Sequence, residues 1–125
     1  MSEASEAPWR VVFAADAIND LRLISDHLIQ AYQGFGESLE EASRHAAARI
    51  DAIISAAERL ATAPLRGESH DDFLPGLRHL ALDRAIYWFR PQPQLRDIQV
   101  LAVFFGGQDH QRHMLVRLLQ KSSER

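Results

Sequence analysis

The hydrophobic pattern of the N-terminal half predicts a short strand followed by a helix. Residues 9–13 (WRVVF) are rich in β-branched and aromatic side chains, as strands are. Asp16 is the predicted N-cap of the helix, because its carboxylate can accept hydrogen bonds from the first exposed amides. Apolar residues then recur at steps of three and four, which places them on one helical face: Leu21, Ile24, Leu28 and Ala31. Gly34 and Gly36 end the pattern.

A second, longer helix begins after this glycine loop. Ser38 is followed three residues later by Glu41, the spacing of a capping box, in which each side chain bonds to the other residue's backbone amide. An apolar stripe follows: Leu39, Ala42, Ala46, Ile50, Ile53, Ala57 and Leu60. Pro64 stops the pattern because it has no amide hydrogen. The two helices are predicted to form an antiparallel hairpin.

The C-terminal part predicts three strands and a last helix. After a polar connection at residues 65–76, strand-like segments occupy 77–82, 84–90 and 98–105. The first two are so close that they fit only an antiparallel hairpin. The third is apolar on both faces, which predicts a central strand. Asp109 is the predicted cap of a helix with one apolar face: Met114, Leu115, Leu118 and Leu119.

The order of these elements predicts an α+β fold. It has an N-terminal strand, a helical hairpin, a three-stranded antiparallel meander and a C-terminal helix, with the hairpin packed on one face of a single sheet. Residues 9–121 form the one predicted domain, between a disordered N-terminal tail at 1–8 and a polar tail at 122–125. The other face of the sheet is then partly open, and a functional surface is expected there.

Composition excludes several classes of protein. The chain has no cysteine, which rules out disulfide bonds, thiolate metal ligands and a cysteine nucleophile. Its longest apolar run, residues 100–105, is far shorter than the roughly 20 residues of a membrane helix. The first eight residues are acidic and small, unlike a signal peptide. A cytoplasmic protein without membrane contact is expected.

Charge is unevenly distributed along the chain. Residues 1–73 carry six arginines against thirteen acids, a net −7, whereas residues 74–125 carry eight basic residues against four acids, a net +4. Thirteen of the fourteen basic residues are arginine, which forms planar, bidentate contacts with phosphate or carboxylate. The basic strands could therefore bind nucleic acid or an acidic protein. Alternatively, the two halves neutralise each other within the fold.

Arginines on the predicted strands form a candidate partner-binding surface. Alternation along residues 84–90 puts Arg84, Trp88 and Arg90 on one side, and Arg78 lies at the start of the preceding strand. Arginine and tryptophan together could bind phosphate and stack on a base. In the alternative interpretation, Trp88 packs against the core or a partner while the arginines stay solvated.

Two histidines offer the other candidate chemistry. His110 and His113 are spaced i, i+3 on the last helix, and either could act as a general acid or base near neutral pH. A zinc site needs at least a third protein ligand, and the sequence offers none at a fixed spacing. We therefore predict no metal and no cofactor. The remaining histidines, His27, His45, His70 and His79, are scattered and indicate nothing specific.

Taken together, residues 9–119 resemble the RelE/ParE toxins of toxin–antitoxin pairs. The resemblance rests on the helical hairpin, the sequence PGLR at residues 75–78, the strand at 84–89 and the strand with its turn at 98–107. It implies the toxin of a type II toxin–antitoxin system, neutralised as a hetero-oligomer by a cognate antitoxin whose flexible segment folds on the toxin. The basic C-terminal part suits an acidic antitoxin segment.

The resemblance leaves two targets open. RelE-like members are ribosome-dependent endoribonucleases that cut mRNA with arginines, lysines and a late Tyr, His or Glu, whereas ParE-like members are similar to inhibitors of DNA gyrase. In this chain the only lysine is Lys121 and no tyrosine follows Tyr87, and an acidic balance suits ribosomal RNA poorly. These departures favour a ParE-like toxin that binds protein and is not an enzyme, so no catalytic residue is assigned.

The alternatives make different demands on the residues. A RelE-like ribonuclease would use basic strand residues and the last helix: Arg78, Arg84, His110 and Arg112. A third possibility is an inactive interaction module, since a fold does not fix a function.

Overall fold

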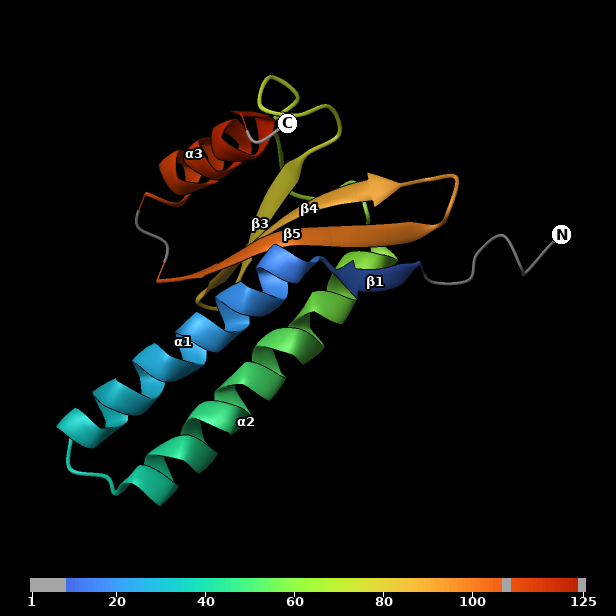
Figure 1. Cartoon of the computed structure of the whole chain (residues 1–125). Coiled ribbons are helices and arrows are strands. Elements are labelled where there is room, and N and C mark those ends of the chain that lie inside the picture. Colours follow the sequence, from blue (N-terminus) through green and yellow to red (C-terminus); the bar gives the residue numbers. More distant parts are fainter. Residues whose placement is uncertain (1–8, 107–108, 124–125) are drawn as a thin grey trace, which may run out of the picture.

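The computed structural model describes residues 9–106 and 109–123, and shows one mixed sheet with helices on both faces (Figure 1). Its elements are β1 (Arg10–Phe13), α1 (Ala15–Gly34), α2 (Leu39–Ala57), the 3-10 helix η2 (Glu58–Thr62), β2 (Glu68–Ser69), β3 (Arg78–Leu82), β4 (Ala85–Gln92), β5 (Asp97–Phe105) and α3 (His110–Ser123). The predicted α+β fold is confirmed. The predicted tail at 1–8, the glycine at 107 and residues 124–125 lie outside the described ranges.

The sheet has five strands in the order β1-β5-β4-β3-β2. β1 pairs parallel with β5, and the other pairings are antiparallel. The apolar strand β5 lies inside the sheet, as predicted. β1 pairs with β5 only as far as Val100, so residues 101–105 have no strand on that side within the described part of the chain.

The short strand β2 lies in the connection that was predicted to be a loop. It pairs with β3 through Glu68 opposite His79 and Ser69 opposite Arg78. A two-residue strand has no periodicity of its own, so only its pairing with β3 defines it. Gly67, at φ +88, permits this approach because a Cβ there would collide with the His79 carbonyl.

The helical hairpin covers one face of the sheet, as predicted (Figure 1). Ser38 and Glu41 form the predicted capping box at the start of α2. On this face α1 and α2 pack against Tyr87 and Phe89 of β4. The buried Tyr87 hydroxyl donates a 2.6 Å hydrogen bond to the Ile53 carbonyl. Within the described residues, no helix has both the length and the apolar character to cross a membrane.

The opposite face, which we expected to be partly open, carries a second core beneath α3. Met114 of α3 is buried with Trp88 of β4 and Ala102 of β5, and Phe73 packs beside them. A bulge makes this possible: Trp88 is opposite Ala102 and Phe89 is opposite Val100, so Leu101 is left without a partner in register. The extra residue lets both Leu101 and Ala102 contribute to the α3 side.

Asp16 does not cap α1, contrary to our prediction. The helix starts at Ala15, and its N-cap Ala14 makes no side-chain hydrogen bond. The backbone explains this early start, because the Ala14 amide still bonds to Val100 of β5 while its carbonyl already accepts from Ile18. Asp16 instead forms a 2.9 Å ion pair with Lys121 at the end of α3.

A buried carboxylate joins α1, β5 and α3. Asp20 Oδ2 accepts hydrogen bonds from the Val103 amide and from Arg117 Nη1, both at 2.9 Å, and Asp20 Oδ1 accepts from Arg117 Nη2 at 2.8 Å. Asp20 is 6% exposed. It therefore satisfies a strand amide on the unpaired part of the β5 edge and fixes α3 to α1 at the same time. Its hydrogen bonds raise the pKa of Arg117 above its ordinary value.

We expect Asp20→Ala to lower the free energy of unfolding by about 3 kcal/mol, because it leaves a half-buried guanidinium and a strand amide without their acceptor. Arg44→Ala is the matched control, since it breaks a solvent-exposed pair with Glu40 and should cost below about 1 kcal/mol. Urea unfolding followed by circular dichroism measures both. Equal losses in the two variants would contradict the role assigned to Asp20.

Candidate functional site

The arginines of the predicted partner surface do not lie together. Arg78 and Arg84 flank opposite ends of β3, where the four steps from Arg78 to Leu82 alone span about 13 Å. Arg78 Nη1 donates to the carbonyl oxygens of Leu65 at 2.8 Å and Gly67 at 3.3 Å. It thus fastens the loop before β2 to the sheet.

Arg90 is held in a similar way. Its Nε donates to the Pro75 carbonyl at 3.0 Å. Arg78 and Arg90 therefore both hydrogen-bond to backbone carbonyls of the segment between α2 and β3. Arg84 and Arg112, in contrast, are exposed to solvent.

Trp88 is not part of an exposed surface, which corrects the prediction of an Arg–Trp–Arg face. Its relative exposure is 0%, because α3 and the segment around Phe73 cover the face to which it points. Its indole Nε1 donates to His110 Nδ1 at 3.1 Å. The alternative, in which this tryptophan packs in the core, is the arrangement found.

Three histidines gather around the Trp88 indole. The rings of His70, His79 and His110 have their centroids 4.7, 4.9 and 5.5 Å from Trp88. Strand register explains two of them: Glu68, His79 and Trp88 are successive cross-strand partners on β2, β3 and β4. His70 Nε2 lies 2.7 Å from His79 Nδ1. No pattern in the sequence reveals this cluster, because the pairing of β2 with β3 and the packing of α3 on the sheet bring its members together.

His110 and His113 do not share a ligand position. The His110 ring faces Trp88 and His79, whereas the His113 ring stacks near Phe104 at 6.0 Å. Because the Trp88 N–H donates to His110 Nδ1, the neutral His110 ring carries its proton on Nε2. The two imidazole rings of this i, i+3 pair therefore point to different neighbours.

Burial is the main influence on the pKa values of His79 and His110. Burial is the main cause that lowers the pKa of His79 below its ordinary value, and the adjacent His110 and His70 lower it further. The pKa of His110 is lowered by burial first and then by His70. Glu68 opposes both shifts. The neutral forms of the two rings are thus favoured in the folded protein.

Two histidines of this cluster, His70 and His79, form a possible metal-binding set together with the neighbouring Glu68. Glu68, His70 and His79 each present one ligand atom, and these atoms lie within 4.8 Å of one another. His70 is buried at 5% exposure, while Glu68 is open to solvent. Two imidazoles and a carboxylate suit divalent transition metals.

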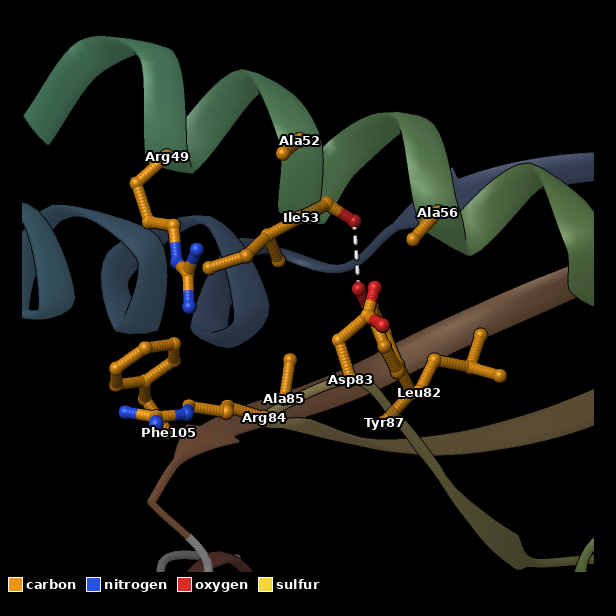
Figure 2. Close-up of a pocket in the computed structure, with 10 residues that line it drawn as sticks. All are labelled: Arg49, Ala52, Ile53, Ala56, Leu82, Asp83, Arg84, Ala85, Tyr87 and Phe105. Carbon is orange, nitrogen blue, oxygen red and sulfur yellow. Dashed lines mark hydrogen bonds between the residues drawn. The ribbon is translucent and has the colours of Figure 1, made fainter. Parts of the chain in front are cut away.

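Arg84 lines a small pocket between α2 and the β3–β4 turn (Figure 2). The pocket has a volume of about 70 Å³, too small for more than a few atoms. Arg49 of α2 lies over the Phe105 ring, with its Cζ 5.5 Å from the ring centre. Figure 2 shows Arg84 beside that ring, away from the Tyr87–Ile53 hydrogen bond. The pocket is thus lined by two guanidinium groups, from Arg49 and Arg84, and by the carboxylate of Asp83.

A larger hollow runs between α1 and α3. It has a volume of about 390 Å³ and an apolar floor formed by the end of β5. Its lining residues are Asp20, Leu23, Ile24, His27, Val103, Phe104, Phe105, His113 and Arg117. Leu23 is 57% exposed although it belongs to this lining. We call this hollow the α1–α3 groove.

The outer surface of α3 carries further exposed apolar residues, on a side of the helix other than the one that His113 and Arg117 turn to the groove. Met114 is buried and Leu118 packs beside it, but Leu115, Val116 and Leu119 are 39%, 45% and 60% exposed. The predicted apolar face of α3 is therefore wider than the sheet can cover. Neighbouring exposed apolar residues on one helix are typical of a binding surface.

The fold is similar to those of solved toxin–antitoxin proteins. The chromosomal ParDE system from P. aeruginosa matches with 20% identity and a TM-score of 0.60, covering 79% of this chain and 97% of that one. The RelBE2 complex from Mycobacterium tuberculosis matches with 17% identity and a TM-score of 0.55, covering 79% and 92%. The chain has the RelE/ParE fold. No protein-family model and no curated protein matches it.

The RelE/ParE fold of this chain separates the four residues that the ribonuclease alternative requires. Arg78 is bonded to loop carbonyls, Arg84 lies beyond the far end of β3, and His110 is engaged by Trp88. Arg112 lies on α3, on the opposite face of the sheet from the Arg84 pocket. The described structure thus brings no pair of them to one reacting centre.

The lowered pKa values of His79 and His110 predict a loss of stability in mild acid. Both lowered pKa values mean that the unfolded chain binds more protons than the folded one, so stability is full above about pH 7.5 and falls as pH drops through about 6.5. Urea unfolding between pH 8 and pH 5.5, in buffer with EDTA, measures this.

The double variant His79→Gln/His110→Gln should flatten this pH dependence, whereas His27→Gln on the exposed side of α1 should leave it unchanged. A wild-type stability that stays constant down to pH 5.5 would rule out the assignment.

Proposed function

We propose that this chain is the toxin of a bacterial type II toxin–antitoxin pair, of the ParE-like branch, that acts in the cytoplasm by binding DNA gyrase. The RelE/ParE fold supports the toxin assignment. The observation that carries it is the α1–α3 groove, because an apolar hollow beside the exposed Leu23 has the character of a site for a protein partner.

The occupant proposed for the groove is a segment of the cognate antitoxin. An amphipathic helix or extended peptide could place apolar side chains on the floor formed by Phe104 and Phe105, next to Leu23. The proposed segment is disordered alone and folds on binding, as regulatory partners commonly do. Acidic residues at its ends would suit the positive balance of residues 74–125.

The disposition of the basic residues supports binding rather than RNA cleavage. Phosphoryl transfer needs charged groups converging on one phosphate. Arg78 Nη1 already donates to loop carbonyls, and His110 Nδ1 already accepts from Trp88. A toxin that binds gyrase would need no such convergence, which favours the ParE-like branch.

Induction of the chain in bacteria should arrest growth with filamentation and intact mRNA, and the purified protein should block supercoiling by gyrase. Co-expression of a cognate antitoxin, for which a small reading frame directly upstream is the first candidate to look for, should restore growth. Primer extension on translated mRNA and a plasmid supercoiling assay distinguish the targets. Cleavage of ribosome-bound mRNA that Arg78→Ala or His110→Ala abolishes would instead establish the ribonuclease, and harmless expression would leave only an interaction module.

Neutralisation by the antitoxin should depend on Leu23. Leu23→Asp places a charge in the α1–α3 groove and should weaken antitoxin binding at least tenfold, measured by calorimetry. Leu39→Asp is the matched control, because Leu39 is 61% exposed against 57% for Leu23 but lies at the start of α2, away from the groove. Equal affinities for the two variants would show that the antitoxin binds elsewhere.

A further inference from the structure

Three potential metal ligands converge on the α3 side of the sheet edge. Glu68 of β2 is the cross-strand partner of His79 of β3, so their side chains emerge on the same face. His70 follows Glu68 by two residues and joins them. His70 Nε2 lies 2.7 Å from His79 Nδ1 and 3.8 Å from Glu68 Oε2.

These separations fit a single metal ion. A tetrahedral zinc with bonds of about 2.1 Å places its ligand atoms about 3.4 Å apart. The measured 2.7 and 3.8 Å lie on either side of this value, and the third separation, between Glu68 and His79, is within 4.8 Å; rotation of the exposed Glu68 side chain brings the three atoms into range. We propose that Glu68, His70 and His79 bind a divalent transition-metal ion, with Zn²⁺ as the expected ligand.

The backbone around His70 is already fixed in place. Its amide donates to the Leu77 carbonyl at 2.8 Å, which closes the loop between β2 and β3. Asp71 holds the same loop, since Oδ1 accepts from the Gly76 amide at 2.8 Å and Oδ2 accepts from the Ser69 hydroxyl at 3.2 Å. Ligand residues held by such hydrogen bonds lose little entropy when a metal binds.

Asp71 is therefore occupied and does not compete as a ligand. His110 is also excluded through Nδ1, which accepts the Trp88 N–H. In the hydrogen bond between His70 and His79, one ring nitrogen must carry the proton. When both nitrogens bind the metal, that proton moves to the other nitrogen of its own ring. Both imidazole rings therefore stay neutral and no proton is released.

Three protein ligands leave a fourth coordination position for water or an added ligand. The site would fasten β2 to β3 directly beside buried Trp88. A bound ion would thus stabilise the edge of the sheet that otherwise depends on two residue pairs. This site is independent of the proposed toxin activity, and either can fail without the other.

The test uses the full chain, stripped with EDTA and then titrated with ZnCl₂ in a calorimeter. We expect one Zn²⁺ per chain, and a rise in Tm of about 10 °C at a hundredfold excess over Kd. Co²⁺ in place of Zn²⁺ should give visible absorption bands characteristic of low coordination number. Ca²⁺ should not compete, because it prefers oxygen ligands.

His79→Gln and Glu68→Gln should each weaken Zn²⁺ binding at least tenfold. His27→Gln, which alters an exposed histidine on α1, is the control and should bind as the wild type does. Glu68 is exposed, so Glu68→Gln keeps the test valid if the histidine variant fails to fold. No saturable binding by the folded wild type, or equal affinity in Glu68→Gln and His27→Gln, would overturn the proposal.

Discussion

The buried carboxylate of Asp20 decides how the helices of this molecule are placed. β1 covers only half of the β5 edge, and an uncovered strand edge leaves amides without partners. Asp20 accepts the Val103 amide and binds Arg117 with both oxygens. The Asp20 side chain thus takes the place of a strand at the part of β5 that β1 does not cover. It also links α1, to which it belongs, to α3. The α1–α3 groove exists because this contact holds the two helices at the same edge.

The sheet separates two different environments on its faces. On the hairpin face, α1 and α2 enclose a continuous apolar core around Tyr87 and Phe89. On the α3 face, the smaller core around Trp88 is bordered by imidazole rings. The bulge beside Trp88 lets β4 and β5 serve both cores, because it adds one residue to the α3 side. The histidine side chains around Trp88 therefore lie on the α3 face of the sheet, which one helix covers, and not on the hairpin face, which two helices cover.

The candidate functions use different parts of this arrangement. The groove offers apolar area for a protein partner, whereas the cluster of Glu68, His70 and His79 offers donor atoms for an ion. Neither depends on the arginines that the sequence placed in the partner surface. Arg78 and Arg90 instead bind loop carbonyls, since a guanidinium beside a loop satisfies several acceptors at once.

The sequence by itself determined the elements whose signals are local: the two long helices, the Ser38 capping box, the β3–β4 hairpin and the buried strand β5. The resemblance in their order predicted the RelE/ParE fold. Only the tertiary structure decided the pairing of β2, the burial of Trp88 and the meeting of His70 with His79. These depend on strand register and on the face that α3 covers, and such contacts between distant residues leave no periodic trace in the chain.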